Sequence, residues 1–86
     1  MIKRTVGDIT IERDGDGLAI QWSLVGSAGT FGFAATPDGA LPLTTAGLTQ
    51  AGVDAAQREA VIGGVWDFTP MEVRSITLDG AAVRTR

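Results

Sequence analysis

Three short stretches of alternating apolar residues occupy the first part of the chain, and their spacing predicts β-strands. The apolar positions are Ile9 and Ile11, then Leu18, Ile20, Trp22 and Leu24, then Phe31, Phe33 and Ala35. Successive side chains of a strand point to opposite faces, so each set lies on one face. Turn-forming residues separate the stretches at 14–17 and 26–29. The pattern predicts a three-stranded antiparallel meander over about residues 8–36, apolar on one side.

The first hairpin of this meander has two registers that keep its apolar residues together. A two-residue turn at 14–15 would place Ile11 opposite Leu18. A four-residue loop over 14–17 would instead place Ile11 opposite Ile20. A loop of odd length is excluded, because a slip of one residue would turn one apolar face toward water.

The second hairpin has one favoured register. A four-residue loop over 26–29 places Leu24 opposite Phe31. The same loop places Trp22 opposite Phe33, and cross-strand pairs of this kind contribute about 0.2–1 kcal/mol relative to alanine. Trp22 is therefore predicted to lie in the core.

The other face of the meander is polar near the first strand and small near the third. Its residues are Thr10, Glu12, Ala19, Gln21, Ser23, Thr30, Gly32 and Ala34. A solvated face is the simpler interpretation. The alternative is a flat surface that another polypeptide backbone approaches closely.

The segment after the meander gives weaker signals. Residues 36–39 carry a proline and a glycine at the positions typical of a β-turn. Residues 40–47 are predicted to be irregular, because Pro42 lacks the N–H group that a central strand needs. Leu41, Leu43 and Leu48 are expected to attach this segment to the core.

One short helix is predicted over about residues 54–62. Asp54 is a favourable N-cap, and Gln57 follows at the position typical of a capping box. The glycines at 63–64 would end the helix, because glycine adopts the left-handed cap conformation without strain. An alternative start at Thr49 would enclose a glycine at some cost. The inner stripe of the helix would consist of Val53, Ala56, Ala60 and Val61.

A C-terminal β-hairpin is predicted over about residues 71–85, with its turn at an Asp-Gly pair. That turn places Leu78 opposite Ala81. Further from the turn, Ile76 would face Val83. Apolar residues fall on both faces of this hairpin, which is typical of a covered strand or of a contact surface. The predicted fold class is α+β, packed as one small domain.

Composition limits the size of the core and the kinds of partner. Hydrophobic residues make up 44% of the 86 residues, but much of that share is alanine, and twelve glycines add no side chain. A chain this short is marginally stable alone, and because it has no cysteine for a disulfide, oligomerisation is one remaining route to stability. The net charge of −3 argues against binding to nucleic acid or to an anionic membrane.

The sequence also bears on location. It has no apolar run long enough to span a bilayer and no secretory signal, so a cytoplasmic location is expected. The arginine-rich, asparagine-free composition is typical of a GC-rich bacterial or phage genome, which makes a virion the second option.

Residues typical of catalytic and metal sites are scarce. The chain has no histidine and no cysteine, which excludes the usual nucleophilic triads and the thiolate or imidazole zinc sites. Asp67, Glu72 and Asp79 are the candidates for a carboxylate hydrolase, but their spacing does not suggest a cleft. We therefore expect a protein that is not an enzyme and has no catalytic residue, cofactor or metal.

The candidate partner-binding residues are Trp66, Phe68, Met71 and Arg74. Tryptophan, methionine and arginine are enriched at protein interfaces. The competing interpretation is a second small core under the helix, because large apolar side chains are usually buried.

These observations predict a non-catalytic protein–protein interaction or assembly subunit of bacterial or phage origin. Its partner would be a second copy of the chain or another protein. The alternative is a small-molecule or carbohydrate-binding module that uses an exposed Trp66 on an open aromatic shelf.

Overall fold

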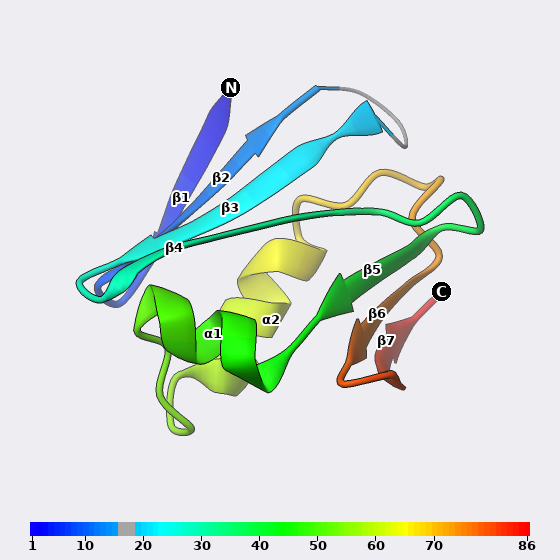
Figure 1. Ribbon diagram of the computed structural model, residues 1–86. Coiled ribbons are helices and arrows are strands. Elements are labelled where there is room, and N and C mark those ends of the chain that lie inside the picture. Colours follow the sequence, from blue (N-terminus) through cyan, green and yellow to red (C-terminus); the bar gives the residue numbers. More distant parts are fainter. Residues whose placement is uncertain (16–18) are drawn as a thin grey trace.

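A computed structural model describes residues 1–15 and 19–86 and shows an α+β fold with two sheets and two helices (Figure 1). The strands are β1 (Ile2–Val6), β2 (Ile9–Asp14), β3 (Gln21–Gly26), β4 (Gly29–Ala34), β5 (Ala40–Leu43), β6 (Ser75–Leu78) and β7 (Ala81–Thr85), and the helices are α1 (Thr45–Ala51) and α2 (Arg58–Trp66). The predicted fold class is confirmed. No described helix is both long and apolar enough to cross a bilayer.

The first four strands form an antiparallel sheet in the order β1-β2-β3-β4. The predicted meander corresponds to β2, β3 and β4. The strand β1 lies outside the predicted range of about 8–36 and adds an edge to the sheet. It was missed because Arg4 stands between Ile2 and Val6 on the inward face and so interrupts the apolar alternation. A tight turn joins β1 to β2, with Gly7 at a φ of 60°.

The register of the second hairpin agrees with the prediction, whereas that of the first does not. Leu24 lies opposite Phe31, and Trp22 lies opposite Phe33. In the first hairpin Ile11 also lies opposite Leu24, so both predicted partners of Ile11 are wrong. The loop between the two strands is longer than either alternative, yet even in length, so the apolar residues still share a face. The predicted partner Leu18 lies outside the described residues.

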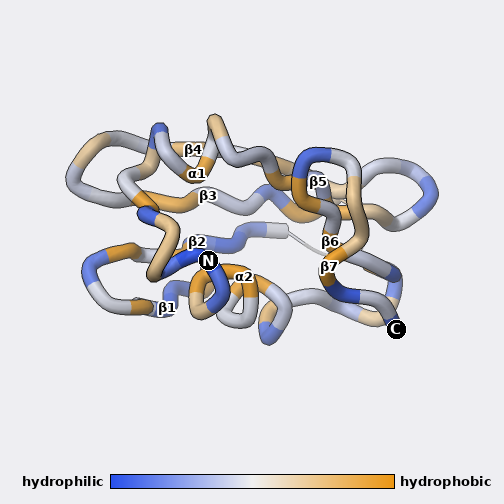
Figure 2. Tube along the Cα trace, turned by 90° about the horizontal axis from the view of Figure 1, so that it is seen from below, coloured by the Kyte–Doolittle hydropathy of each residue, from blue (hydrophilic) through white to orange (hydrophobic). Residues whose placement is uncertain are grey.

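Both helices pack on the apolar face of this sheet. Helix α1 covers β3 and β4, and α2 covers β1 and β2 (Figures 1 and 2). The second sheet, of order β5-β6-β7, closes one end of the same layer. The other face of the four-stranded sheet carries the polar and small residues, and these are exposed or half-buried wherever they are described.

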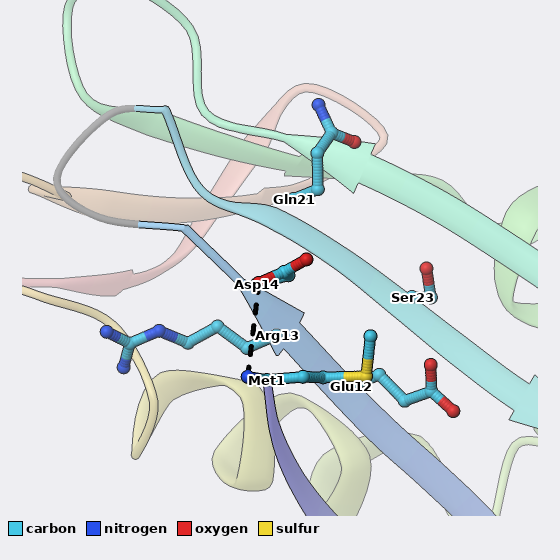
Figure 3. Close-up of a pocket in the computed structure, with 6 residues that line it drawn as sticks. All are labelled: Met1, Glu12, Arg13, Asp14, Gln21 and Ser23. Atoms are coloured by element: carbon cyan, nitrogen blue, oxygen red, sulfur yellow. Dashed lines mark ion pairs between the residues drawn. The ribbon is translucent and has the colours of Figure 1, made fainter.

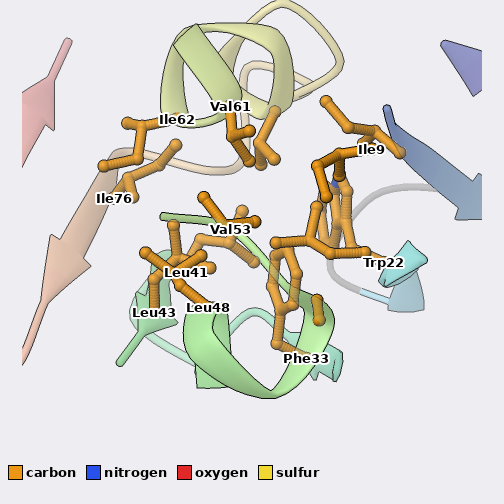
Figure 4. Close-up of a cluster of buried hydrophobic side chains, with 14 of the residues drawn as sticks. Ile9, Trp22, Phe33, Leu41, Leu43, Leu48, Val53, Val61, Ile62 and Ile76 are labelled. Atoms are coloured by element: carbon orange, nitrogen blue, oxygen red, sulfur yellow. The ribbon is translucent and has the colours of Figure 1, made fainter. Parts of the chain in front are cut away.

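The core fills the space between the sheet and the helices (Figure 4). It consists of Ile9, Ile11, Ile20, Trp22, Leu24, Phe33, Leu41, Leu43, Leu48, Ala51, Val53, Val61, Ile62, Val65, Val73 and Ile76. Trp22 is 0% exposed, which confirms its predicted place in the core. Its ring stacks with that of Phe33 at 6.1 Å between centroids.

The segment predicted to be irregular, residues 40–47, contains β5 and the start of α1. Pro42 lies in β5, at an edge of the second sheet, so its exclusion from a central position was correct. Helix α1 begins after Thr44, whose hydroxyl accepts the N–H of Gly47 at 2.9 Å. It ends at Gly52, which has a φ of 92°. A glycine inside so short a helix weakens its sequence signal.

Helix α2 is shifted relative to the predicted range of 54–62. The predicted capping box forms, with Asp54 and Gln57 exchanging hydrogen bonds of 3.0 and 3.3 Å, but in the turn that precedes the helix. The glycines at 63–64 lie inside the helix and do not end it. Of the predicted inner stripe, Val53 and Val61 are buried, and both alanines are exposed.

The two adjacent glycines of α2 are expected to respond oppositely to alanine. At Gly64 a Cβ would lie 2.7 Å from Cδ1 of Ile11, a buried side chain of β2. At Gly63 the nearest atom would be 4.0 Å away. Gly63→Ala should therefore raise the free energy of unfolding by about 1 kcal/mol through helix propensity. Gly64→Ala should lower it, and urea denaturation of both variants measures the contrast; changes of the same sign would contradict this packing.

The C-terminal hairpin forms around the predicted Asp-Gly turn, with Asp79 and Gly80 at φ values of 52° and 88°. Leu78 lies opposite Ala81, as predicted. Ile76 faces Arg84 and not Val83, because the register shifts between Ile76 and Thr77. The first strand begins at residue 75, so residues 71–74 of the predicted hairpin belong to a loop.

Candidate functional site

The loop over residues 67–74 links α2 to β6 and carries most of the predicted partner-binding residues. Arg86, which follows β7, holds this loop. Its Nε donates to the carbonyl of Val73 at 2.8 Å, and its Nη2 donates to the carbonyls of Thr69 and Pro70 at 2.9 and 3.2 Å. The same Nη2 donates to the hydroxyl of Thr69 at 2.6 Å. One guanidinium therefore fixes the backbone at three positions of the loop.

Trp66 and Phe68 form the base of the loop. Both are half-buried and pack against the core. The guanidinium of Arg86 lies over the ring of Trp66, with 4.5 Å between Cζ and the ring centroid. A second arginine, Arg13 of β2, donates to the carbonyl of Phe68 at 2.6 Å. These two aromatic residues thus extend the main core and do not form a second small core.

Met71 and Arg74 project from the loop. Met71 is 74% exposed, more than any other large apolar side chain among the described residues. Arg74 is also exposed, and its backbone N–H donates to the carbonyl of Gly39 at 2.7 Å. The four candidates therefore divide into two residues that support the loop and two that it displays.

Sequence reasoning missed the residues that hold the loop. Arg86 and Arg13 carry no local signal for this role, because their contacts join positions far apart in the chain. The Thr69 side chain is likewise a loop hydroxyl of ordinary appearance.

The three candidate acids for hydrolase chemistry lie in different settings. Asp67 forms an ion pair with Arg4 of β1 at 2.9 Å. Glu72 is exposed on the loop. Asp79 accepts the N–H of Thr45 at 2.9 Å and also its hydroxyl, so it caps the start of α1 from the turn of the C-terminal hairpin. These contacts give Asp67 and Asp79 structural roles.

Acid is expected to weaken the protein through Asp79. Hydrogen bonds from the hydroxyl and N–H of Thr45 lower the pKa of this carboxyl below its ordinary value of 3.8. A lowered folded-state pKa stabilises the fold above the ordinary pKa, and this contribution is lost as the pH falls through the folded-state pKa. Asp79→Asn should therefore lower the urea midpoint at neutral pH and reduce its decline below a pH of about 4.

Hydrogen exchange of the Thr45 amide supplies a local control for this prediction. Asp79→Asn should speed exchange there, because the amide loses a charged acceptor. Asp38, whose pKa is also lowered, bonds to Thr36 and not to α1. Asp38→Asn should leave the Thr45 amide unchanged, and equal effects of the two variants would refute the capping role.

Two shallow hollows are among those on the described part of the surface. One, of about 190 Å³, lies beside the start of β1 and the open face of β2 and β3 (Figure 3). It is lined by Met1, Glu12, Arg13, Asp14, Gln21 and Ser23. The other, of about 250 Å³, lies between α1 and α2. Both are smaller than the roughly 300–1,000 Å³ of typical ligand pockets. Within the described ranges, no three acidic side chains are grouped as metal ligands.

Comparisons of the chain with protein-family models, curated proteins and solved structures give no match.

The basic residues near both termini are largely neutralised by contacts within the fold. Lys3 pairs with Glu12, and Arg84 pairs with Glu59.

Proposed function

We propose that the protein is a non-catalytic protein–protein interaction or assembly subunit, and that its 67–74 loop contacts the partner. The observation that carries this proposal is an exposed Met71 on a loop whose backbone is fixed by Arg86. The free energy falls when a partner removes exposed apolar surface from water, so this surface favours association. A loop that is already ordered loses little conformational entropy on binding, which favours association.

The chemistry of the loop also describes the partner. Met71 offers a flexible apolar side chain that fits an irregular pocket. Arg74 places a positive charge near the end of the same loop. The partner surface that fits is an apolar pocket with an acidic rim, on another protein.

The carbohydrate-binding alternative receives less support from this geometry. It requires an open aromatic shelf, whereas Trp66 is half-buried and Arg86 lies against its ring. The bacterial or phage setting, cytoplasmic or in a virion, remains part of the proposal and is supported by composition alone.

Affinity purification from the source cells, followed by titration with the recovered partner, tests the proposal. Met71→Ser should weaken binding by about tenfold or more, because it removes the displayed apolar side chain. Ile2→Ser is the matched control, since Ile2 is also a large exposed apolar residue, at 49%, on the distant strand β1. Equal binding by wild type and Met71→Ser, or equal losses in both variants, would refute the proposed contact.

Removing the guanidinium that holds the loop is expected to loosen it without unfolding the protein. Arg86→Ala should speed hydrogen exchange of the Val73 amide, which bonds to the Pro70 carbonyl inside the loop, by about tenfold or more. Arg84→Ala is the control, because Arg84 pairs with Glu59 of α2. Unchanged exchange in Arg86→Ala would show that the loop is ordered by other contacts.

A further inference from the structure

The outer strands of the two sheets differ in how they are protected from pairing with other chains. Edge strands present unpaired N–H and C=O groups, and natural proteins commonly protect them with charges, prolines or irregularities. β1 carries Lys3 and Arg4, and β5 carries Pro42. β7 carries Arg84 and a shift in its register. The strand β4 has the sequence Gly-Thr-Phe-Gly-Phe-Ala, with no charge and no proline.

At Thr30 and Gly32 of β4, the backbone N–H and C=O groups point away from the neighbouring strand β3. The carbonyl of Thr30 accepts a hydrogen bond of 2.6 Å from Nε2 of Gln50, an exposed side chain of α1. Successive residues of a strand direct their hydrogen-bonding groups to alternate edges, so Gly32 presents its N–H and C=O to the same side. Gly32 is exposed, and among the described strands β4 pairs with β3 alone.

We propose that β4 of one copy pairs antiparallel with β4 of a second copy, centred on Gly32, to form one continuous sheet. Such pairing about a two-fold axis is self-complementary. It would place Thr30 of each copy opposite Ala34 of the other. The proposal concerns a different surface from the 67–74 loop and does not depend on it.

The absence of charged residues around β4 favours a second copy of the chain as the partner of this edge. Antiparallel self-pairing brings the residues nearest the two-fold axis close to their own equivalents, so it is disfavoured where the middle of the strand is charged. β4 is uncharged, and so are the outward residues of its neighbour β3, which are Gln21, Ser23 and Val25. Self-pairing through β1 would instead bring the positive charges of Lys3 and Arg4 against those of the second copy.

Gln50 competes with the proposed contact. Its side-chain amide occupies the Thr30 carbonyl that strand pairing would use. Because Gln50 is exposed, exchanging this bond for a backbone bond requires no change in the core. Gln50→Ala removes this competing amide and should lower the dissociation constant of the dimer by a few fold, roughly the net contribution of one exposed hydrogen bond.

Sedimentation equilibrium of the purified chain, from about 1 µM to about 1 mM, tests the proposal. Wild type and Gly32→Ala should both dimerise, because an added methyl at this position would meet its nearest atom only at 3.8 Å. Gly32→Lys should weaken dimerisation by about tenfold or more, because it opposes two like charges across the axis. Thr5→Lys, on the same open face at the far edge strand, should have no such effect.

Several outcomes would overturn this inference. They are a monomer throughout the concentration range, equal effects of Gly32→Lys and Thr5→Lys, and a dimer lost in Met71→Ser but retained in Gly32→Lys. Circular dichroism and the thermal midpoint show whether each variant folds. If Gly32→Lys does not fold, Gln50→Ala decides, because unchanged or weaker self-association contradicts the proposed edge. Loss of the loop's partner in Met71→Ser with an intact dimer separates the two proposals.

Discussion

Replacing Trp22 with alanine is expected to unfold the protein or to leave it without fixed side-chain packing. Trp22 is fully buried and stacks with Phe33, which in turn stacks with Phe31 at 5.2 Å between centroids. Truncating a buried aromatic residue to alanine costs about 3–5 kcal/mol, since the cavity collapses only partly. That is a large part of the roughly 5–15 kcal/mol that stabilises a typical domain.

A phenylalanine at the same position supplies the control. The indole N–H of Trp22 is buried and has no hydrogen-bond partner among the described residues. Trp22→Phe removes this unsatisfied donor, which offsets part of the loss in packing. Urea denaturation followed by far- and near-ultraviolet circular dichroism should therefore rank wild type and Trp22→Phe well above Trp22→Ala. An unchanged midpoint in Trp22→Ala would place Trp22 outside the core.

Gly26→Ala is expected to destabilise the protein strongly, although it adds only one methyl group. Gly26 ends β3 where the last turn of α1 crosses it. A Cβ there would lie 1.9 Å from the carbonyl oxygen of Ala51 and 2.7 Å from Cδ1 of Ile9. The first of these atoms belongs to the backbone, so α1 must move away from the sheet. Forcing atoms into a packed interior typically costs about 1–3 kcal/mol, and displacing a helix places this variant at the upper end.

The edge strand provides a matched comparison for Gly26. Gly32 lies in the neighbouring strand β4, and a Cβ there would meet its nearest atom, the Trp22 carbonyl oxygen, at 3.8 Å. Gly32→Ala should leave the thermal midpoint unchanged or slightly raised, because glycine weakens a strand interior by about 0.5–1 kcal/mol. Similar midpoints for the two alanine variants would show that α1 does not press on Gly26.

The sheet was predictable from the sequence because its signal is local. Alternation with a period of two specifies which residues share a face, and the loop of 26–29 specifies the pairing of Trp22 with Phe33. The register of the first hairpin could not be predicted from the sequence, because its loop is longer than the local turn residues suggest. Arg13 occupies an inward position opposite Trp22, which an apolar pattern does not anticipate.

The helices were predicted less well, because packing overrides local preference there. Glycine ordinarily ends or weakens a helix, yet Gly47 and Gly64 lie inside α1 and α2. A Cβ at Gly47 would lie 2.4 Å from the ring of Phe31, and one at Gly64 would press on Ile11. Both glycines allow a helix to approach the sheet closely, a requirement that exists only in the folded protein.

The candidate site was half predictable for the same reason. Its displayed residues, Met71 and Arg74, are recognisable by type in the sequence. The arginine that orders them is not, because Arg86 meets Thr69 and Trp66 only after β7 has paired with β6.

The parallel pairing of β5 with β6 has a consequence for synthesis on the ribosome. β5 precedes both helices, but the strand it pairs with follows them. The meander can close from neighbouring segments as they emerge, whereas β5 must wait for downstream residues and its loop closure is slower. In a nascent chain that stalls before β6, the meander has formed but part of its apolar face is still exposed to water. We expect chaperones to bind this intermediate.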